Sequence, residues 1–191
     1  MSQTPFPELL HDALRYRSGA GRLAPWRVPP ALRPWLLDAG SLTRRLVRVS
    51  NGDFRVEVLR QGYLPTLPVE RQELGLGMRE WPFVREVLLR CHDQPWVFAR
   101  TLIPRTTLQG RVRGLTHLGT KPLGAVLFSD PQVRRGPIAV ARLQPARLGL
   151  DLPAATPLWG RRSVFYISGL PLLVSEYFLP DCPLYQHPVQ D

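Results

Sequence analysis

The chain has 191 residues, 44% hydrophobic and 21% charged, which is enough for one globular domain, residues 1–191, with a sizeable core. Its formal net charge is +10, carried by scattered arginines without a nucleic-acid-binding motif, so it favours small anionic substrates over nucleic acid. No apolar run approaches the roughly 20 residues of a membrane span and no secretory signal begins the chain, so we expect a cytoplasmic location without stable membrane insertion.

The N-terminal region is predicted to contain two helices. Apolar residues at helical spacing predict a helix over 5–17, with Thr4 as its N-cap. The Gly- and Pro-rich residues 19–30 predict a loop. A short helix over 31–37 follows, and Gly40 ends it.

Residues 42–60 are predicted to form a β-hairpin. The segments LTRRLVRVS and FRVEVLRQG flank Asn51-Gly52-Asp53, and Asn-Gly between alternating residues is a strong hairpin signal. Residues 61–81 are predicted to be irregular, with a short helical piece around 70–78. A connection of this length inside a compact domain is often a lid or a binding segment.

A second hairpin is predicted over 83–103, with its turn at His92-Asp93-Gln94-Pro95. On its first strand Arg85 shares a face with Val87 and Leu89, while Glu86 lies on the opposite face. An arginine on an apolar strand face marks a candidate site, because a buried charge requires a partner. The structural alternatives are an ion pair with Glu176 or partial exposure.

Residues 104–119 predict a loop, after which Thr120 is predicted to cap a short helix that ends at Phe128. Backbone N–H groups near Leu123, at the start of this helix, would be free to bind an anion unless Thr120 and water cap them. The Pro-rich segment 129–157 is predicted to hold a short strand at 137–141.

The last hairpin is predicted within LWGRRSVFYISGLPLLVSEYFLPDCPLY, residues 158–185, around the turn SGLP. Alternation places Glu176 on one strand face with Leu172, Val174 and Phe178. A carboxylate on such a face must be paired, protonated or used in chemistry. Glu176 is therefore a candidate site residue, and the alternatives are solvent exposure or pairing with an arginine.

Residue types that hold cofactors are few and scattered. Cys91 and Cys182 are the only cysteines, and we expect both to be reduced. The four histidines lack metal-type spacing, and no phosphate-binding loop or nucleophile elbow occurs. We therefore expect no metal and no cofactor, so an enzyme built from this chain would act through side chains and backbone dipoles.

Antiparallel hairpins separated by short helices predict an α+β fold with helices on one face of the sheet. Four segments resemble the chorismate pyruvate-lyase family in content and order: WLLDAGSLTRRL, VREVLLRCHDQPWVFARTLIP, LGTKPLGAVLF and the C-terminal hairpin. They span residues 35–185, and LWGRRS followed by E-x-F-L-P-x-x-P-L-Y is not a generic pattern. Residues 186–191 are expected to be a loose tail.

The resemblance implies a single six-stranded antiparallel sheet, with helices on one face and flaps that enclose a ligand cavity. The family's substrate-binding arginine falls on Arg85 and its functional glutamate on Glu176. Two backbone contacts to the substrate fall on Leu42 and Leu123. Leu42 stands where the family pattern has Met, a change that a backbone contact should tolerate.

The implied reaction is elimination of pyruvate from chorismate, which leaves 4-hydroxybenzoate and is the first committed step towards ubiquinone. It needs no cofactor, because aromatisation drives it. Arg85 would bind the ring carboxylate in a bidentate pair. Glu176 would hold the ring 4-hydroxyl or act as general base for the C4 hydrogen, whereas intramolecular transfer of that hydrogen would need no enzymic base.

A non-catalytic alternative shares this architecture, namely the small-molecule (effector) binding domains of bacterial transcription regulators. Those regulators carry an N-terminal winged-helix domain, and the residues before Trp35 are too few to form one. The chain has no sustained heptad and no spare apolar stripe, so we expect a monomer.

Overall fold

The computed structural model describes residues 23–143 and 157–186, and within them seven strands form one antiparallel sheet in the order β1-β2-β3-β7-β6-β4, with β5 also paired to β6. The strands are β1 (Phe54–Tyr63), β2 (Phe83–Cys91), β3 (Gln94–Ile103), β4 (Arg134–Arg135), β5 (Ala139–Leu143), β6 (Leu158–Ile167) and β7 (Leu170–Phe178). The helices are α2 (Arg33–Leu36), α3 (Leu42–Val49), α4 (Pro68–Leu74) and α5 (Leu123–Leu127), with 3₁₀ segments at Pro25–Arg27, Pro30–Leu32, Gly110–His117 and Pro183–Tyr185. The α+β class is confirmed, and the predicted helix over 5–17 lies outside the described residues. None of the helices in the described part of the chain has the length and apolar character needed to cross a bilayer.

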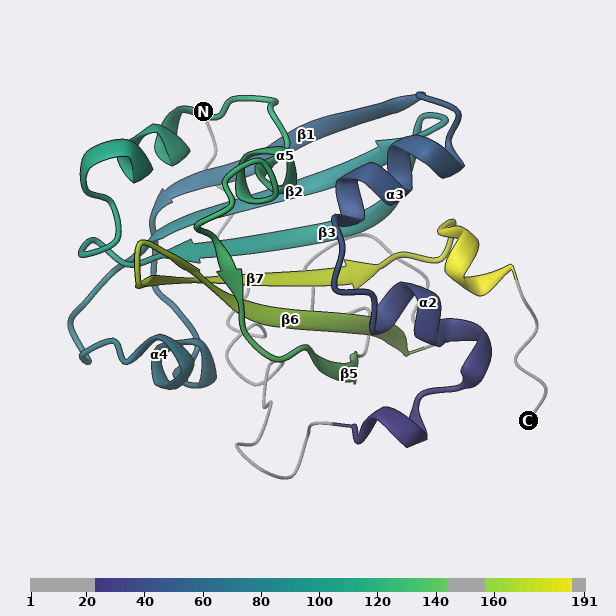
Figure 1. The fold of residues 1–191 in the computed structure, drawn as a ribbon, viewed down its shortest axis with the longest axis horizontal. Helices are drawn as coiled ribbons and strands as arrows, with labels where there is room; N and C mark the ends of the chain where they lie inside the picture. The colour runs from purple at the N-terminus through teal and green to yellow at the C-terminus, as the bar shows by residue number, and fades with distance from the viewer. Residues whose placement is uncertain (1–22, 144–156, 187–191) are drawn as a thin grey trace, which may run out of the picture.

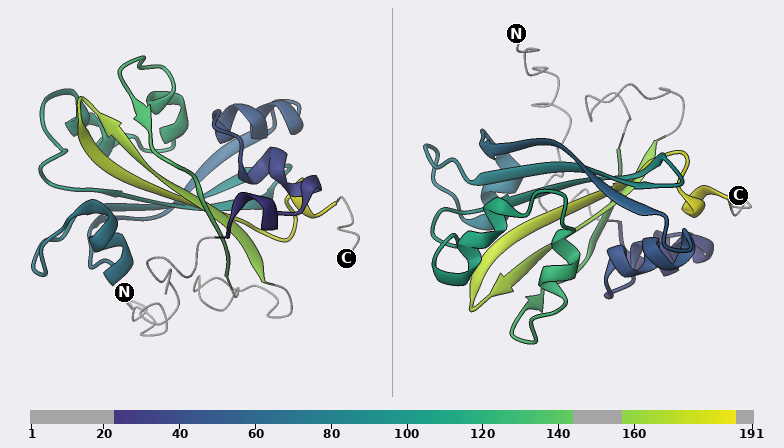
Figure 2. Two further views of the ribbon diagram at one scale, coloured as in Figure 1. Left: turned by 60° about the horizontal axis from the view of Figure 1, so that its bottom comes forward. Right: turned by 90° about the horizontal axis from the view of Figure 1, so that it is seen from above.

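Helices cover both faces of the sheet (Figure 1). α2, α3 and α5 lie on one face, which we call the cavity face, and α4 lies on the other, the α4 face (Figure 2). Leu67 and Val69, at the start of α4, pack with Leu88 and Phe98 of the sheet. Leu88 points to the face opposite Val87, so the prediction of helices on one face is wrong for α4.

One edge of the sheet is a single strand interrupted in its middle. β4 and β5 both pair with β6, with Arg135 opposite Phe165 and Ala139 opposite Arg162, so the edge carries one extra residue between these pairs. Pro137 lies in the interruption and has no N–H to donate to a strand ladder. The resemblance implied six strands, and this break divides one of them, which gives seven.

Both long hairpins are confirmed, with turns shorter than predicted. His92 and Asp93 join β2 to β3 with φ of 50° and 60°, and Ser168 and Gly169 join β6 to β7 with φ of 50° and 81°. Positive φ at both turn positions gives a twist that matches the flanking strands. The last two residues of each predicted turn belong to the strands instead.

The predicted hairpin over 42–60 is wrong in its first half, where the chain forms α3. Ser41 caps this helix by accepting a backbone hydrogen bond at 3.3 Å. Leu42 and Leu46, one helical turn apart, are both buried in the core on the cavity face. Asn51 and Gly52, with φ of 51° and 90°, therefore follow the end of a helix, and β1 pairs with β2.

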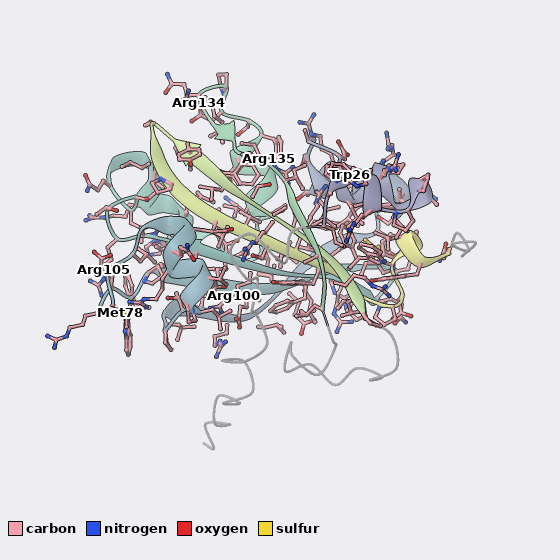
Figure 3. All side chains as sticks on the ribbon, turned by 90° about the horizontal axis from the view of Figure 1, so that it is seen from below. Trp26, Met78, Arg100, Arg105, Arg134 and Arg135 are labelled. Atoms are coloured by element: carbon pink, nitrogen blue, oxygen red, sulfur yellow. The ribbon has the colours of Figure 1, made fainter. Side chains whose placement is uncertain are left out.

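A buried charge network fixes α4 to the sheet. Arg100, 2% exposed, forms ion pairs with Glu70 of α4 and Glu86 of β2. Arg60 binds the other carboxylate oxygen of Glu86 at 2.7 Å. Figure 3 shows Arg100 and Arg135 on opposite sides of the sheet, so this network is separate from the groups on the cavity face.

The segment before α5 is more regular than predicted. Much of the predicted loop over 104–119 is a 3₁₀ segment, and Leu115 and Leu118 pack with Leu123 of α5 and Phe165 of β6. The N-cap of α5 is Pro122 rather than Thr120, and no side chain caps the helix. The start of α5 is therefore held by apolar packing instead of by a capping hydroxyl.

Gly160 of β6 packs against an aromatic ring with no room for a side chain. A Cβ at this position would lie 2.6 Å from Cδ1 of Tyr177 and 3.3 Å from the carbonyl oxygen of Glu176. We expect Gly160→Ala to lower the free energy of unfolding by about 1–3 kcal/mol, measured by chemical denaturation, because overpacking forces the ring or the strand to move. Gly114→Ala is the matched control, since a Cβ there meets no atom within 4 Å. Equal stability of the two variants would contradict this account.

Candidate active site

A cavity lies on the cavity face, between the sheet and the first residues of α3 and α5. In the described part of the chain its lining is mostly apolar and carries four charged side chains, Arg85, Arg135, Arg161 and Glu176. A mainly apolar pocket in which a few charged groups converge is the usual form of a small-molecule site.

The strand order fixes the order of side chains across the cavity floor. Arg85 lies on β2, Thr101 on β3, Glu176 on β7, Arg161 on β6 and Arg135 on β4, and these strands are neighbours in that sequence. Neighbouring strands are about 4.8 Å apart. The two outer arginines therefore stand on opposite sides of the cavity, with the carboxylate between them.

Arg85 is buried, 3% exposed, and forms no ion pair with any carboxylate of the described residues. Its Nη2 donates to the carbonyl oxygens of Gly119 at 2.8 Å and Lys121 at 3.3 Å. Its Nε is buried without a hydrogen-bond partner in the described part of the chain. Burial lowers the pKa of Arg85, because desolvation disfavours the charged form. An anion that entered the cavity would restore this lost stabilisation.

Glu176 pairs with Arg161, its direct neighbour across β6 and β7, and not with Arg85. Arg161 Nε donates to Oε2 of Glu176 at 2.7 Å, and its Nη1 donates to the carbonyls of Trp35 and Asp38 at 2.7 and 2.9 Å. The alternative that Glu176 pairs with an arginine is thus confirmed, yet its carboxylate also lines the cavity. Oε1 has no hydrogen-bond partner among the described residues, so it is available to a ligand hydroxyl.

Arg135 reaches the cavity from the interrupted edge of the sheet. Its Nε donates to Oγ of Ser163 at 3.0 Å, its Nη1 donates to the carbonyl of Asp38 at 3.3 Å, and its guanidinium lies 5.1 Å from the ring centroid of Phe165. Burial, followed by repulsion from Arg161, lowers the pKa of Arg135 to about 10. The side chain therefore remains charged at neutral pH in an environment that disfavours the charge.

Two helix starts complete the cavity. Leu42 and Leu123 are the first residues of α3 and α5, and both line it. First-turn N–H groups have no acceptor within their own helix, and Ser41 satisfies one of them at α3. The two starts pack closely, since a Cβ on Gly124 would lie 2.7 Å from Oγ1 of Thr43.

Other candidate groups lie away from the cavity. Cys91 and Cys182 are free and buried in the core. Within residues 23–143 and 157–186, no group of three or more His, Cys, Asp or Glu side chains is placed to hold a metal ion. Residues 61–81, whose length suggested a lid, supply none of the cavity lining.

The structure places the four predicted site residues, Arg85, Glu176, Leu42 and Leu123, on the lining of one cavity. It adds Arg161 and Arg135, which the sequence did not single out. Strand alternation along LWGRRSVF, residues 158–165, could have placed Arg161 on the same face as Phe165. Arg135 gave no comparable signal, because its strand is two residues long.

A family model described as chorismate lyase matches residues 25–190, a span that includes every residue of the cavity lining. A probable chorismate pyruvate-lyase from Pseudomonas aeruginosa strain PAO1 is 46% identical over 153 residues, which cover 80% of this chain and 85% of that protein. A probable chorismate pyruvate-lyase from Marinobacter nauticus is 43% identical over 185 residues, which cover 95% of this chain and 94% of that protein.

Solved structures of bacterial transcription regulators share the fold. PhnF from Mycobacterium smegmatis aligns with a TM-score of 0.54 at 18% identity, covering 76% of this chain and 66% of that chain. A GntR-family regulator from Bacillus cereus aligns with a TM-score of 0.52 at 13% identity, covering 68% of this chain and 93% of that chain. At these identities the likeness is one of fold alone.

Proposed function

The chain belongs to the chorismate lyase family, and from this premise we propose that it eliminates pyruvate from chorismate and releases 4-hydroxybenzoate. The observation that supports this proposal is the charge of the cavity. Beside the paired Arg161 and Glu176, the lining holds two guanidiniums, Arg85 and Arg135, that form no ion pair within the described residues. Chorismate has two carboxylates, so the charges of ligand and cavity are complementary.

In the proposed binding mode, Arg85 takes the ring carboxylate. Its planar fork suits a bidentate, charge-assisted pair that also fixes the plane of the ring, with Nη1, which has no partner among the described residues, as the donor beside the buried Nε. The 4-hydroxyl, at the opposite end of the ring, donates to Oε1 of Glu176. Backbone groups at Leu42 and Leu123 supply the remaining polar contacts.

The reaction breaks the bond between C3 and the ether oxygen and removes a hydrogen from C4. The ring becomes aromatic, and the departing enolpyruvate takes up a proton and becomes pyruvate. Aromatisation supplies the driving force, so we infer that the reaction proceeds without a cofactor. The protein's part is to orient the ring in an apolar cavity, which can lower a barrier by several kcal/mol.

Family membership and the sequence support three further parts of the proposal: the oligomeric state, the cellular location and the use of the product. We infer that the chain works as one monomeric domain in the cytoplasm and that its 4-hydroxybenzoate enters ubiquinone biosynthesis. Flaps that close over the bound ring belong to the same proposal. The close packing of Gly124 against Thr43 supports the starts of α5 and α3 as the elements that cover the ligand.

The direct test is to incubate the purified protein with chorismate and to follow the product by ultraviolet absorbance and chromatography. We expect 4-hydroxybenzoate and pyruvate in equal amounts. A protein that binds chorismate or 4-hydroxybenzoate tightly without turnover would overturn the proposal. That outcome would favour an effector-binding domain, for which the fold shared with transcription regulators provides the precedent.

A further inference from the structure

The cavity carries one more cation than a ligand with a single carboxylate requires. Arg161 is neutralised by Glu176 at 2.7 Å. Neither Arg85 nor Arg135 forms an ion pair with the described residues. Once Arg85 has taken the ring carboxylate, Arg135 still has no ion pair with a described residue, because the carboxylates of Glu176 and Asp38 attract it without forming a salt bridge.

Arg135 is held rigidly by neutral groups that leave part of its guanidinium unused. Ser163 and the Asp38 carbonyl accept from Nε and Nη1, and the guanidinium lies over the ring of Phe165. Nη2 has no acceptor among residues 23–143 and 157–186. A fixed, partly desolvated guanidinium whose Nη2 is unused is prepared to bind an anion, because little side-chain freedom remains to be lost.

The order of groups across the sheet matches the order of polar groups along the substrate. From β2 to β4 the cavity presents Arg85, then Glu176, then Arg161 and Arg135. In chorismate the ring carboxylate and the 4-hydroxyl lie at opposite ends of the ring, and the enolpyruvyl ether is on the carbon next to the hydroxyl. With the first two groups on Arg85 and Glu176, the enolpyruvyl carboxylate falls beyond Glu176.

We propose that Arg135 binds the enolpyruvyl carboxylate and so distinguishes the substrate from the aromatic product, an inference that rests on the proposed function. 4-Hydroxybenzoate keeps the ring carboxylate and loses the enolpyruvyl one. Arg135 therefore contributes to binding of chorismate and not to binding of 4-hydroxybenzoate. This difference favours release of the product over release of the substrate.

Arg161, the other cation on this side of the cavity, has its charge balanced by a carboxylate of the protein. Its Nε binds Glu176, its Nη1 binds two backbone carbonyls, and it is 1% exposed. Its part is to hold Glu176 in position. Nη2 of Arg161, like Nη2 of Arg135, has no acceptor among the described residues, so the two arginines differ in charge balance: Arg161 has Glu176 as its counter-ion, and Arg135 forms no ion pair in the described part of the chain.

The test compares Arg135→Gln with Arg134→Gln, its neighbour on the same short strand, in the full-length protein. Arg134 is exposed and Figure 3 shows it at the outer tip of β4, away from the body of the molecule. For Arg135→Gln we expect the KM for chorismate to rise by about 10- to 100-fold, the effect of losing one charge-assisted pair. The inhibition constant of 4-hydroxybenzoate should stay within about twofold, and Arg134→Gln should match the wild type in both constants.

The KM for chorismate and the inhibition constant of 4-hydroxybenzoate are both independent of how much enzyme is folded. Arg135→Lys supplies a second variant, which keeps the charge. We expect Lys to restore part of the lost affinity for chorismate, because it lacks the planar fork. An unchanged KM in Arg135→Gln would overturn the inference, as would a rise in the inhibition constant parallel to that in KM. If the wild-type protein does not convert chorismate at all, the proposed function itself is wrong, which is a different result.

Discussion

Replacement of Arg85 by alanine is expected to lower kcat/KM for chorismate by about 100- to 1,000-fold, because it leaves the ring carboxylate buried without a partner. Arg85 is 3% exposed, has a buried Nε without a partner in the described part of the chain, and forms no ion pair there. No other described residue that lines the cavity on the β2 side carries a positive charge. Steady-state kinetics with chorismate measures the loss.

The inhibition constant of 4-hydroxybenzoate gives a second readout for the same variant. Since the product keeps the ring carboxylate, we expect its inhibition constant to rise in parallel with the KM, unlike in Arg135→Gln. Arg85→Lys should recover only part of the activity. Arg90→Ala is the matched control, because Arg90 is on the same strand, pairs with Glu57 and does not line the cavity. Near-normal kinetics of Arg85→Ala would refute the carboxylate role.

The features that the sequence predicted well are those set by local rules. The hairpin around His92 and Asp93 follows from turn residues, and the placement of Arg85 beside Val87 follows from strand alternation. Glu176 was singled out by the same alternation. In each case a few neighbouring residues decide which face a side chain occupies.

The structural features that the sequence did not predict depend on contacts between residues distant in the chain. LTRRLVRVS contains three β-branched residues and precedes Asn-Gly, which favours a strand, yet it forms α3, because Leu42 and Leu46, four residues apart, bury one helical stripe against the sheet. The pairing of Glu176 with Arg161 depends on the register of β6 against β7. α4 lies on the far face because Arg100 and Glu70 tie it there.

The split edge explains why Arg135 could not be predicted. Two residues make no periodic pattern, and β4 is recognisable only by its partners on β6. β4 pairs Arg135 with Phe165, and because directly opposed residues share one face of a sheet, this pairing places the Arg135 side chain in the cavity beside Phe165. The third cavity arginine is therefore placed by a strand pairing that the sequence pattern does not reveal.

The two roles open to Glu176 make different predictions for two substitutions. Glu176→Ala removes the acceptor for the 4-hydroxyl and leaves Arg161 buried without its counter-ion, so we expect kcat/KM to fall by about 100- to 1,000-fold. Glu176→Gln keeps an oxygen for Arg161 Nε and keeps the shape of the side chain. In a positioning role, which the bond from Arg161 favours, Gln should lower kcat by less than about tenfold, whereas loss of a general base costs about 100- to 10,000-fold.

Single-turnover measurements with Glu176→Gln separate these roles, because they isolate the chemical step from product release. The amide does not neutralise Arg161, so the thermal midpoint of each variant must be recorded beside its rate. A fall in the chemical rate beyond about 100-fold, with the midpoint unchanged, would make Glu176 the base that takes the C4 hydrogen. Retained chemistry would instead leave the hydrogen to the departing enolpyruvyl group and make Glu176 the residue that holds the ring by its hydroxyl, opposite Arg85.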